Sequence, residues 1–269
     1  MIIRKLADAI REQNWFTVVI EILIVVIGIF LGLQVTDWNE ARQDRIQEQI
    51  YLERMAQDLD RDYNNLSTGL KFTTFRHQEA TYVLNSQDFN TIEPCRFIFA
   101  AFISTFFGQP VINRQTFDEM VSSGRLTLLR SNPLKDALGQ YYAYEGQLNR
   151  THDIAHTISN NNYAAHVPYI SVEWSRMGAD PETLGALLNA DSLDGYPPTC
   201  DAMPLEKIIE RHAGIWQNPE VSGWSGVLAA SQLAVAQNYV TAIKYNRAAR
   251  ALVALELGET MPNNDEETR

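Results

Sequence analysis

The sequence is poor in cysteine and lacks the short motifs that carry the commonest enzyme chemistries. Its two cysteines, Cys95 and Cys200, are far apart, and neither lies in a C-x-x-C or other metal-binding spacing. It contains no glycine-rich phosphate loop, no dinucleotide-binding fingerprint and no nucleophile elbow. We therefore predict a protein that is not an enzyme and that holds no cofactor.

Basic residues are also in short supply. The 269-residue chain has 22 lysines and arginines against 33 aspartates and glutamates, a net charge of -11, and it contains no long basic run. An acidic chain repels phosphate groups, which argues against nucleic acid and against an anionic membrane surface as general partners. Hydrophobic residues make up 45% of the chain, enough for a soluble domain with an ordinary core.

One long apolar run dominates the N-terminal part of the chain. Between Trp15 and Trp38, residues 16–33 are apolar except for a threonine, a glutamate and two glycines. As a helix they cover roughly 27 Å, close to the hydrocarbon thickness of a bilayer, with a tryptophan at each headgroup level. A buried core helix or a cleaved signal peptide is the alternative, but no Ala-x-Ala-like site follows the run. We predict a membrane helix over residues 15–38 that serves as an uncleaved signal anchor.

Three residues inside this run suggest a contact with another helix. Gly28 and Gly32 form a G-x-x-x-G pair, which bares the backbone on one face and lets a second helix approach. Glu21 places a carboxylate within the apolar run, which costs a few kcal/mol unless it is paired, protonated or able to reach the interface. Either Glu21 snorkels toward the headgroups, or it meets a partner inside an oligomer or a larger membrane complex.

The run divides the chain into four predicted parts. Residues 1–14 form a cytoplasmic amphipathic tail before the membrane helix, residues 39–257 a periplasmic all-α domain, and residues 258–269 a disordered acidic tail. Basic residues flank the membrane helix on both sides, so the positive-inside rule decides little. We place the N-terminus in the cytoplasm because its tail is short. This predicts a single-pass protein of the bacterial inner membrane.

In an oxidising compartment the two cysteines can pair. A disulfide between Cys95 and Cys200 would close a long loop and stabilise the domain by about 4 to 5 kcal/mol in the chain-entropy treatment. The alternative is two unrelated buried thiols.

The domain is predicted to be entirely helical, with about six helices. No proline or glycine interrupts residues 39–68, so the membrane helix is expected to continue into a long stalk helix that ends near Leu84. Its apolar seam repeats at three and four: Leu52, Met55, Leu59, Tyr63, Leu66 and Leu70.

Residues 94–108 are too short to span a bilayer and predict a buried core helix. Thr116 is expected to cap a short helix that ends at Gly124. Four later helices are expected to start at prolines: Pro133, Pro181, Pro204 and Pro219.

Two stretches resemble a family of uncharacterised single-pass bacterial membrane proteins, a domain of unknown function. In EILIVVIGIFLGLQVTDWNEARQDR the shared residues are Glu21, Val26-Ile27-Gly28-Ile29, Leu33-Gln34 and Trp38-Asn39-Glu40; the family's glycine before the glutamate is Ile20 here. TFDEMVSSGRLTLLRSNPLKDALGQYY is similar to that family's Ser-Ser-Gly-x-Leu segment and the Tyr-Tyr helix that follows it. The resemblance covers about one fifth of the chain. It implies an envelope protein with a helical domain and no known activity.

Several polar and aromatic patterns have a functional and a purely structural interpretation. His152 and His156 share a helix face at i and i+4 and could bind zinc, with His166 as a third ligand, but Asp153 stands where metalloproteases carry glutamate. Asp58, Asp60 and Asp62 are expected to form a solvated helix face. A run of phenylalanines is expected in the core, with a lipid or quinone pocket as the alternative: Phe97, Phe99, Phe102, Phe106 and Phe107.

The function that these patterns favour is non-catalytic. We expect a structural or interaction subunit of a homo-oligomer or a larger membrane complex, which contacts the bilayer and its partners through the membrane helix and stalk. One alternative is a periplasmic ligand-binding, sensor-like module. The other is a metal-dependent hydrolase that uses His152 and His156.

Overall fold

A computed structural model describes residues 15–170 and 203–259 of the chain. In these two ranges the structure is helical and contains no strand, which confirms the all-α prediction. The predicted tail over 1–14, the helix expected at Pro181 and residues 260–269 lie outside the described residues. The described α-helices are α2 (Trp15–Asn85), α3 (Pro94–Ile103), α4 (Gln115–Ser122), α5 (Asn132–Ile170), α7 (Leu205–Gln217) and α8 (Pro219–Leu257).

The chain divides into two compact units, and the boundary falls within α2 between Tyr51 and Leu52. The described part of the first unit is helix alone. As expected from the absence of proline and glycine over residues 39–68, α2 is continuous and ends one residue beyond the predicted Leu84. The second unit holds the remaining part of α2 and all the other helices.

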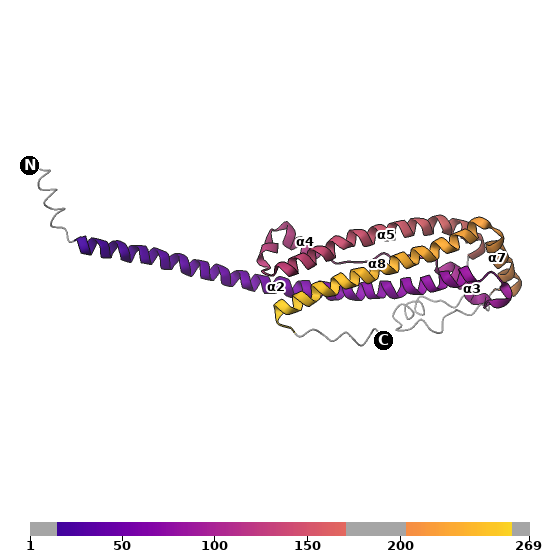
Figure 1. Cartoon of the computed structure of the whole chain (residues 1–269), viewed down its shortest axis with the longest axis horizontal. Helices are drawn as coiled ribbons and strands as arrows, with labels where there is room; N and C mark the ends of the chain where they lie inside the picture. Colours follow the sequence, from indigo (N-terminus) through magenta and orange to yellow (C-terminus); the bar gives the residue numbers. More distant parts are fainter. Residues whose placement is uncertain (1–14, 171–202, 260–269) are drawn as a thin grey trace, which may run out of the picture. The chain divides into compact units, whose positions relative to one another are not determined.

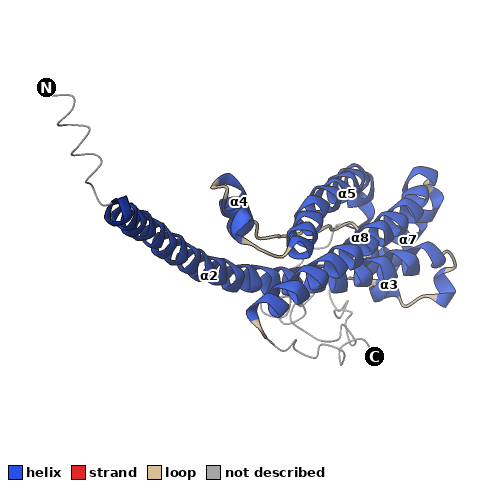
Figure 2. Cartoon of the chain, turned by 60° about the vertical axis from the view of Figure 1, so that its left-hand side comes forward, coloured by secondary structure: helices blue, strands red, loops and turns tan. Residues whose placement is uncertain are grey.

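Three long helices form the body of the second unit (Figure 1). The part of α2 after Tyr51, α5 and α8 run alongside one another, and both views agree on this arrangement (Figure 2). The predicted seam of α2 supplies the core: Leu52, Met55, Leu59 and Leu66 are buried, whereas Tyr63 and Leu70 are half-buried. Leu134, Leu138 and Leu148 of α5 and Val235 and Val253 of α8 are buried as well.

Short helices close the two ends of this body. At one end α3 and α7 pack together around a core cluster that includes Phe97, Ile98 and Ile215. Helix α3 is a buried core helix, as predicted, but it ends at Ile103, five residues before the predicted end. Phe97, Phe99 and Phe102 are buried, whereas Phe106 lies past the helix and is exposed, so it does not belong to the core.

Helix termini mostly follow the predicted signals. Asn218 caps α8, since its side chain accepts hydrogen bonds from the backbone N–H groups of Glu220 and Val221. Gly258 ends α8 at φ +70°, a left-handed conformation that glycine adopts without strain. The expected Thr116 cap is wrong: α4 begins at Gln115, and the Thr116 hydroxyl is directed to another helix.

Candidate functional site

The apolar run of α2 is exposed along its length. Val19, Phe30 and Trp38 are 52%, 61% and 69% exposed, and the large apolar side chains between them are exposed as well. Among the described residues α2 is the helix long and apolar enough to cross a membrane, and none of that stretch is buried. A core helix of a water-soluble protein would bury these side chains, so this stretch is no part of a core within the described chain.

The three predicted contact residues lie on one face of α2. At 100° per residue, Glu21, Gly28 and Gly32 fall within about 40° of one another around the helix axis. A Cβ atom added to either glycine would meet no atom within 4 Å, so both patches of backbone are open. The Thr36 hydroxyl donates to the Gly32 carbonyl at 3.1 Å, which keeps a polar group inside the helix hydrogen-bond pattern. The side chain of Trp15 lies outside the described residues.

The two predicted metal ligands have different surroundings. His152 is buried at 3% exposure, and neither of its ring nitrogens has a hydrogen-bond partner. His156 is exposed, and its Nδ1 lies 3.3 Å from the side-chain amide of Asn160. No group of three potential ligands gathers within the described part of the chain, and the side chain of His166 lies outside it. The arrangement gives the zinc hypothesis no geometric support.

His152 instead packs as part of the core. Its ring meets the edge of the Tyr239 ring, with 5.1 Å between centroids. Burial, and then the positive charge of Arg76, lower the pKa of His152 to about 4. The imidazole is therefore neutral at neutral pH.

Cys95, at the start of α3, is disulfide-bonded. Cys200 lies outside the described residues, so the pairing of these two cysteines stays a prediction.

Two aspartates expected on a solvated face are buried instead. Asp62 is 0% exposed and accepts hydrogen bonds from the backbone N–H of Asn113 at 2.7 Å and from the Tyr141 hydroxyl at 2.8 Å. Burial raises the pKa of Asp62 to about 6, although both hydrogen bonds favour the charged form. Asp60 points elsewhere and pairs with Arg250 of α8 at 2.8 Å.

Asp58 joins the same cluster one turn earlier on α2. Its carboxylate accepts hydrogen bonds from the Thr116 hydroxyl at 2.5 Å and from the Asn113 side chain at 2.9 Å. Next along the chain, Arg114 donates to Glu145 of α5 at 2.7 Å and forms an ion pair with Asp118 of α4 at 3.1 Å. The cluster thus ties the segment before α4 to both α2 and α5. Its role is structural, since every carboxylate in it accepts a hydrogen bond from a donor within the protein.

The helical phase of these aspartates could have predicted the cluster, although their charge suggested a solvated face. Asp58 and Asp62 are spaced by four residues, and both are in phase with the seam residues Met55 and Leu66. Asp60 is out of phase, and it is the one with an exposed side chain. Phase on the helix therefore separates the buried acids from the solvated one.

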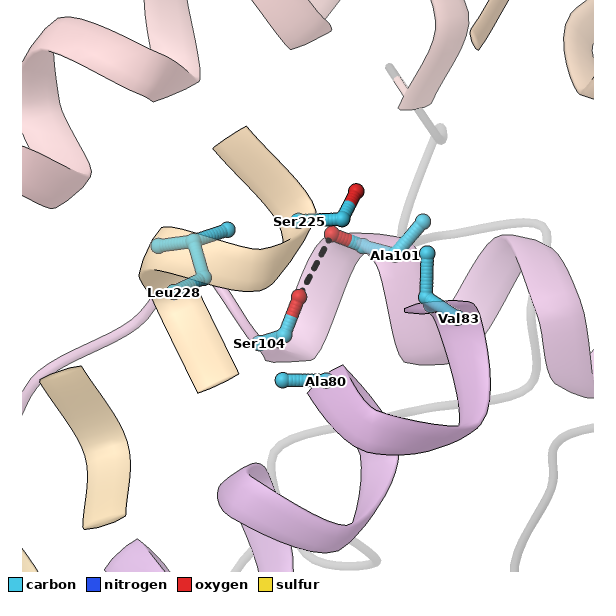
Figure 3. Close-up of a pocket in the computed structure, with 6 residues that line it drawn as sticks. All are labelled: Ala80, Val83, Ala101, Ser104, Ser225 and Leu228. Carbon is cyan, nitrogen blue, oxygen red and sulfur yellow. Dashed lines mark hydrogen bonds between the residues drawn. The ribbon is translucent and has the colours of Figure 1, made fainter. Parts of the chain in front are cut away.

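A small cleft among α2, α3 and α8 offers no binding site. Ala80 and Val83 of α2, Ala101 of α3, Ser104 directly after α3, and Ser225 and Leu228 of α8 line it (Figure 3). The Ser104 hydroxyl donates to the Ala101 carbonyl at 3.1 Å, and the space between the side chains does not admit a water molecule. It is a close-packed helix junction.

Taken together, the fold is an all-α protein with one exposed apolar segment near its N-terminus. Residues 21–153 match a family of unknown function, DUF6090. The match contains both stretches that carry the resemblance noted from the sequence, and it confirms that resemblance to an uncharacterised family. No curated protein and no solved structure matches the chain.

Proposed function

We propose that this protein is a bitopic membrane protein whose helical domain acts as a structural or interaction subunit. The observation that carries the proposal is the exposure of every large apolar side chain described between Val19 and Val35. Left in water, such a surface is far larger than soluble monomers tolerate, and lipid or another protein must cover it. In this proposal the N-terminus is cytoplasmic and the helical domain is periplasmic.

The partner is proposed to bind along the face of α2 that carries Glu21, Gly28 and Gly32. Open backbone at the two glycines allows a second helix to approach closely. A carboxylate on the same face gains most from a contact that removes it from lipid. A second copy of this chain satisfies both requirements, because a symmetric pair would place the same glycines against each other.

Anchoring is tested by fractionating cells that express the full chain. The protein should sediment with membranes, resist an alkaline wash and require detergent for extraction. Recovery of the protein in the aqueous fraction without detergent would refute the membrane assignment. Protease protection of the C-terminal domain in intact inner-membrane vesicles or spheroplasts then tests which side it occupies.

Association is tested by crosslinking in native membranes. Gly28→Leu with Gly32→Leu covers both backbone patches and should reduce crosslinked dimers or complexes while leaving the protein in the membrane. Val26→Leu with Phe30→Leu is the matched control, since these positions lie on the opposite face of the helix. Equal crosslinking by wild type and the glycine variant would contradict the proposed contact face.

A ligand-binding role is the second candidate, and one observation favours it. The second unit contains a cavity beside an arginine for which the described residues supply no carboxylate partner. This role does not require the contact face on α2.

A further inference from the structure

Among the described residues, the second unit contains a partly open, polar cavity that is large enough for a small ligand. Its volume is about 320 Å³, at the lower end of the range for small-molecule sites. It lies among three parts of the fold: α2 contributes Asn65, Thr68, Gly69, Phe72 and Arg76, the segment after α3 contributes Gly108, Gln109 and Val111, and α8 contributes Tyr239.

The wall formed by α2 and α8 depends on Gly69. A Cβ atom at this position would lie 2.5 Å from ring atoms of Tyr239. Only a residue without a side chain lets the tyrosine ring rest on the backbone of α2 at this point. Tyr239 itself is buried, and its hydroxyl lies 2.7 Å from the same position. The ring and its phenol oxygen are thus held firmly at the cavity.

Arg76 brings a positive charge that the described residues do not neutralise. Its Nη1 donates to the Phe106 carbonyl at 2.8 Å, and no ion pair joins it to a carboxylate in the described ranges. Other arginines of this unit differ: Arg96 pairs with Glu79 at 2.9 Å, and Arg114 with Glu145 at 2.7 Å. Burial lowers the pKa of Arg76 to about 10, which still leaves the guanidinium charged at neutral pH.

The buried polar atoms near Arg76 do not supply a negative charge to pair with its guanidinium. The Phe106 carbonyl that accepts from Arg76 also accepts from the Gln232 side-chain amide at 3.0 Å. The Gln232 Oε1 atom and both ring nitrogens of His152 are buried without a hydrogen-bond partner. None of these groups is an anion, because His152 is neutral and glutamine carries no charge. Within the described ranges, the polar groups that contact Arg76 or lie beside it are therefore neutral.

From this geometry we propose that the cavity binds the carboxylate of a small organic monoanion, with Arg76 as its charged partner. A guanidinium has five donors in a planar fork that fits a carboxylate, and within the described residues one of them, on Nη1, donates to the protein. Arg76 is the one cation among the described residues that line the cavity, so a single negative charge is balanced there, whereas a phosphate dianion would leave charge uncompensated. Thr68, Gln109 and Tyr239 can bind a polar substituent, and Phe72 and Val111 can contact a short apolar part.

The proposal does not rest on membrane anchoring or on the contact face of α2. It is tested on the full chain in a nonionic detergent, by isothermal titration and thermal unfolding, with propionate, lactate and benzoate at constant ionic strength. We expect saturable binding of at least one carboxylate, with inorganic phosphate weaker. No saturable binding of any of the three below about 10 mM would overturn the proposal, because a paired charge alone supports affinity in this range.

Variants at Arg76 separate charge from geometry. Arg76→Gln should abolish binding, and Arg76→Lys should weaken it by about tenfold or more because an ammonium group lacks the planar fork. Arg150→Gln, at an exposed arginine of α5, is the control and should bind as wild type. If Arg76→Gln fails to fold, Val111→Trp keeps the test open: it fills the cavity from an exposed position without touching the charge, and it should also abolish binding. Undiminished binding by either variant would overturn the site.

Discussion

Apolar side chains are exposed in one part of α2 and buried in the other. Before the boundary at Tyr51, Ile24 and Leu33 are exposed, whereas after it Leu59 and Leu66 are completely buried. Apolar side chains before the boundary surround the helix, and those after it follow a spacing of three and four. A continuous apolar surface is suited to lipid, and an apolar stripe is suited to other helices.

Acidic residues also differ in exposure between the two parts of α2. Glu21 is exposed on the apolar part of the helix, whereas Asp58 and Asp62 are buried on the part that faces the domain. The two aspartates are tolerated because Asn113, Thr116 and Tyr141 donate hydrogen bonds to them. One continuous helix can therefore be adapted to two surroundings, and each side chain must be judged by what surrounds it.

Placing charge within the apolar part should have the largest effect. Val25→Lys with Ile29→Lys should release the protein from membranes, because each lysine near the centre of a span costs about 2.5–3.5 kcal/mol. Fractionation measures the effect. Ile46→Lys with Ile50→Lys has the same spacing beyond the apolar run and should stay anchored. A double-lysine protein that resists alkaline extraction would contradict the contrast between the two parts of α2.

Shortening a side chain in the domain part should have the next largest effect. Leu66→Ala should reduce the free energy of unfolding of the domain by about 2–5 kcal/mol, because it removes buried methyl groups and leaves a cavity. The same change at exposed Leu33 should leave the stability of the domain unchanged. Denaturant unfolding in detergent, followed by tyrosine and tryptophan fluorescence, measures both. Comparable losses for the two variants would show that residues 19–36 are part of the folded core.

Removing the buried histidine should alter the response to acid. The pKa of His152 is lowered to about 4 in the folded protein, so stability is full above pH 6.5 and is lost as the pH falls toward 4. His152→Leu lacks this loss, and its advantage over wild type should grow by about 3 kcal/mol between pH 7 and pH 4. Urea titrations at several pH values measure it. His156→Leu, on the exposed side, should follow wild type, and a flat difference for His152→Leu would refute the interpretation.

The titration of Asp62 should change the stability with pH in the opposite direction to His152, and by a slightly smaller amount. Its pKa is raised to about 6 in the folded protein, so stability is lost as the pH rises from about 4 through 6. The stability of Asp62→Asn relative to wild type should therefore increase by about 2.5 kcal/mol from pH 4 to pH 7. The same urea titrations detect it. Because His152 and Asp62 oppose each other in this range, only the single variants reveal either slope clearly.

Most helix positions could be predicted because their signals are local. Prolines at helix starts, the Asn218 cap and the left-handed Gly258 each act over one turn of backbone. The Thr116 cap failed because Asp58, which is distant in sequence, accepts its hydroxyl hydrogen bond. The solvated face assigned to the aspartates failed for the same reason: their donors come from other helices and loops.

Residue order alone predicts that the chain is helical and that one segment is too apolar for water, because periodicity and composition act along a single helix. The packing of the helices, in contrast, is what buries Asp62 and His152 and leaves Arg76 without a carboxylate partner in the described chain. The energy of a buried polar group depends on donors, acceptors and charges brought together from distant parts of the chain. Those neighbours exist only after the helices have packed.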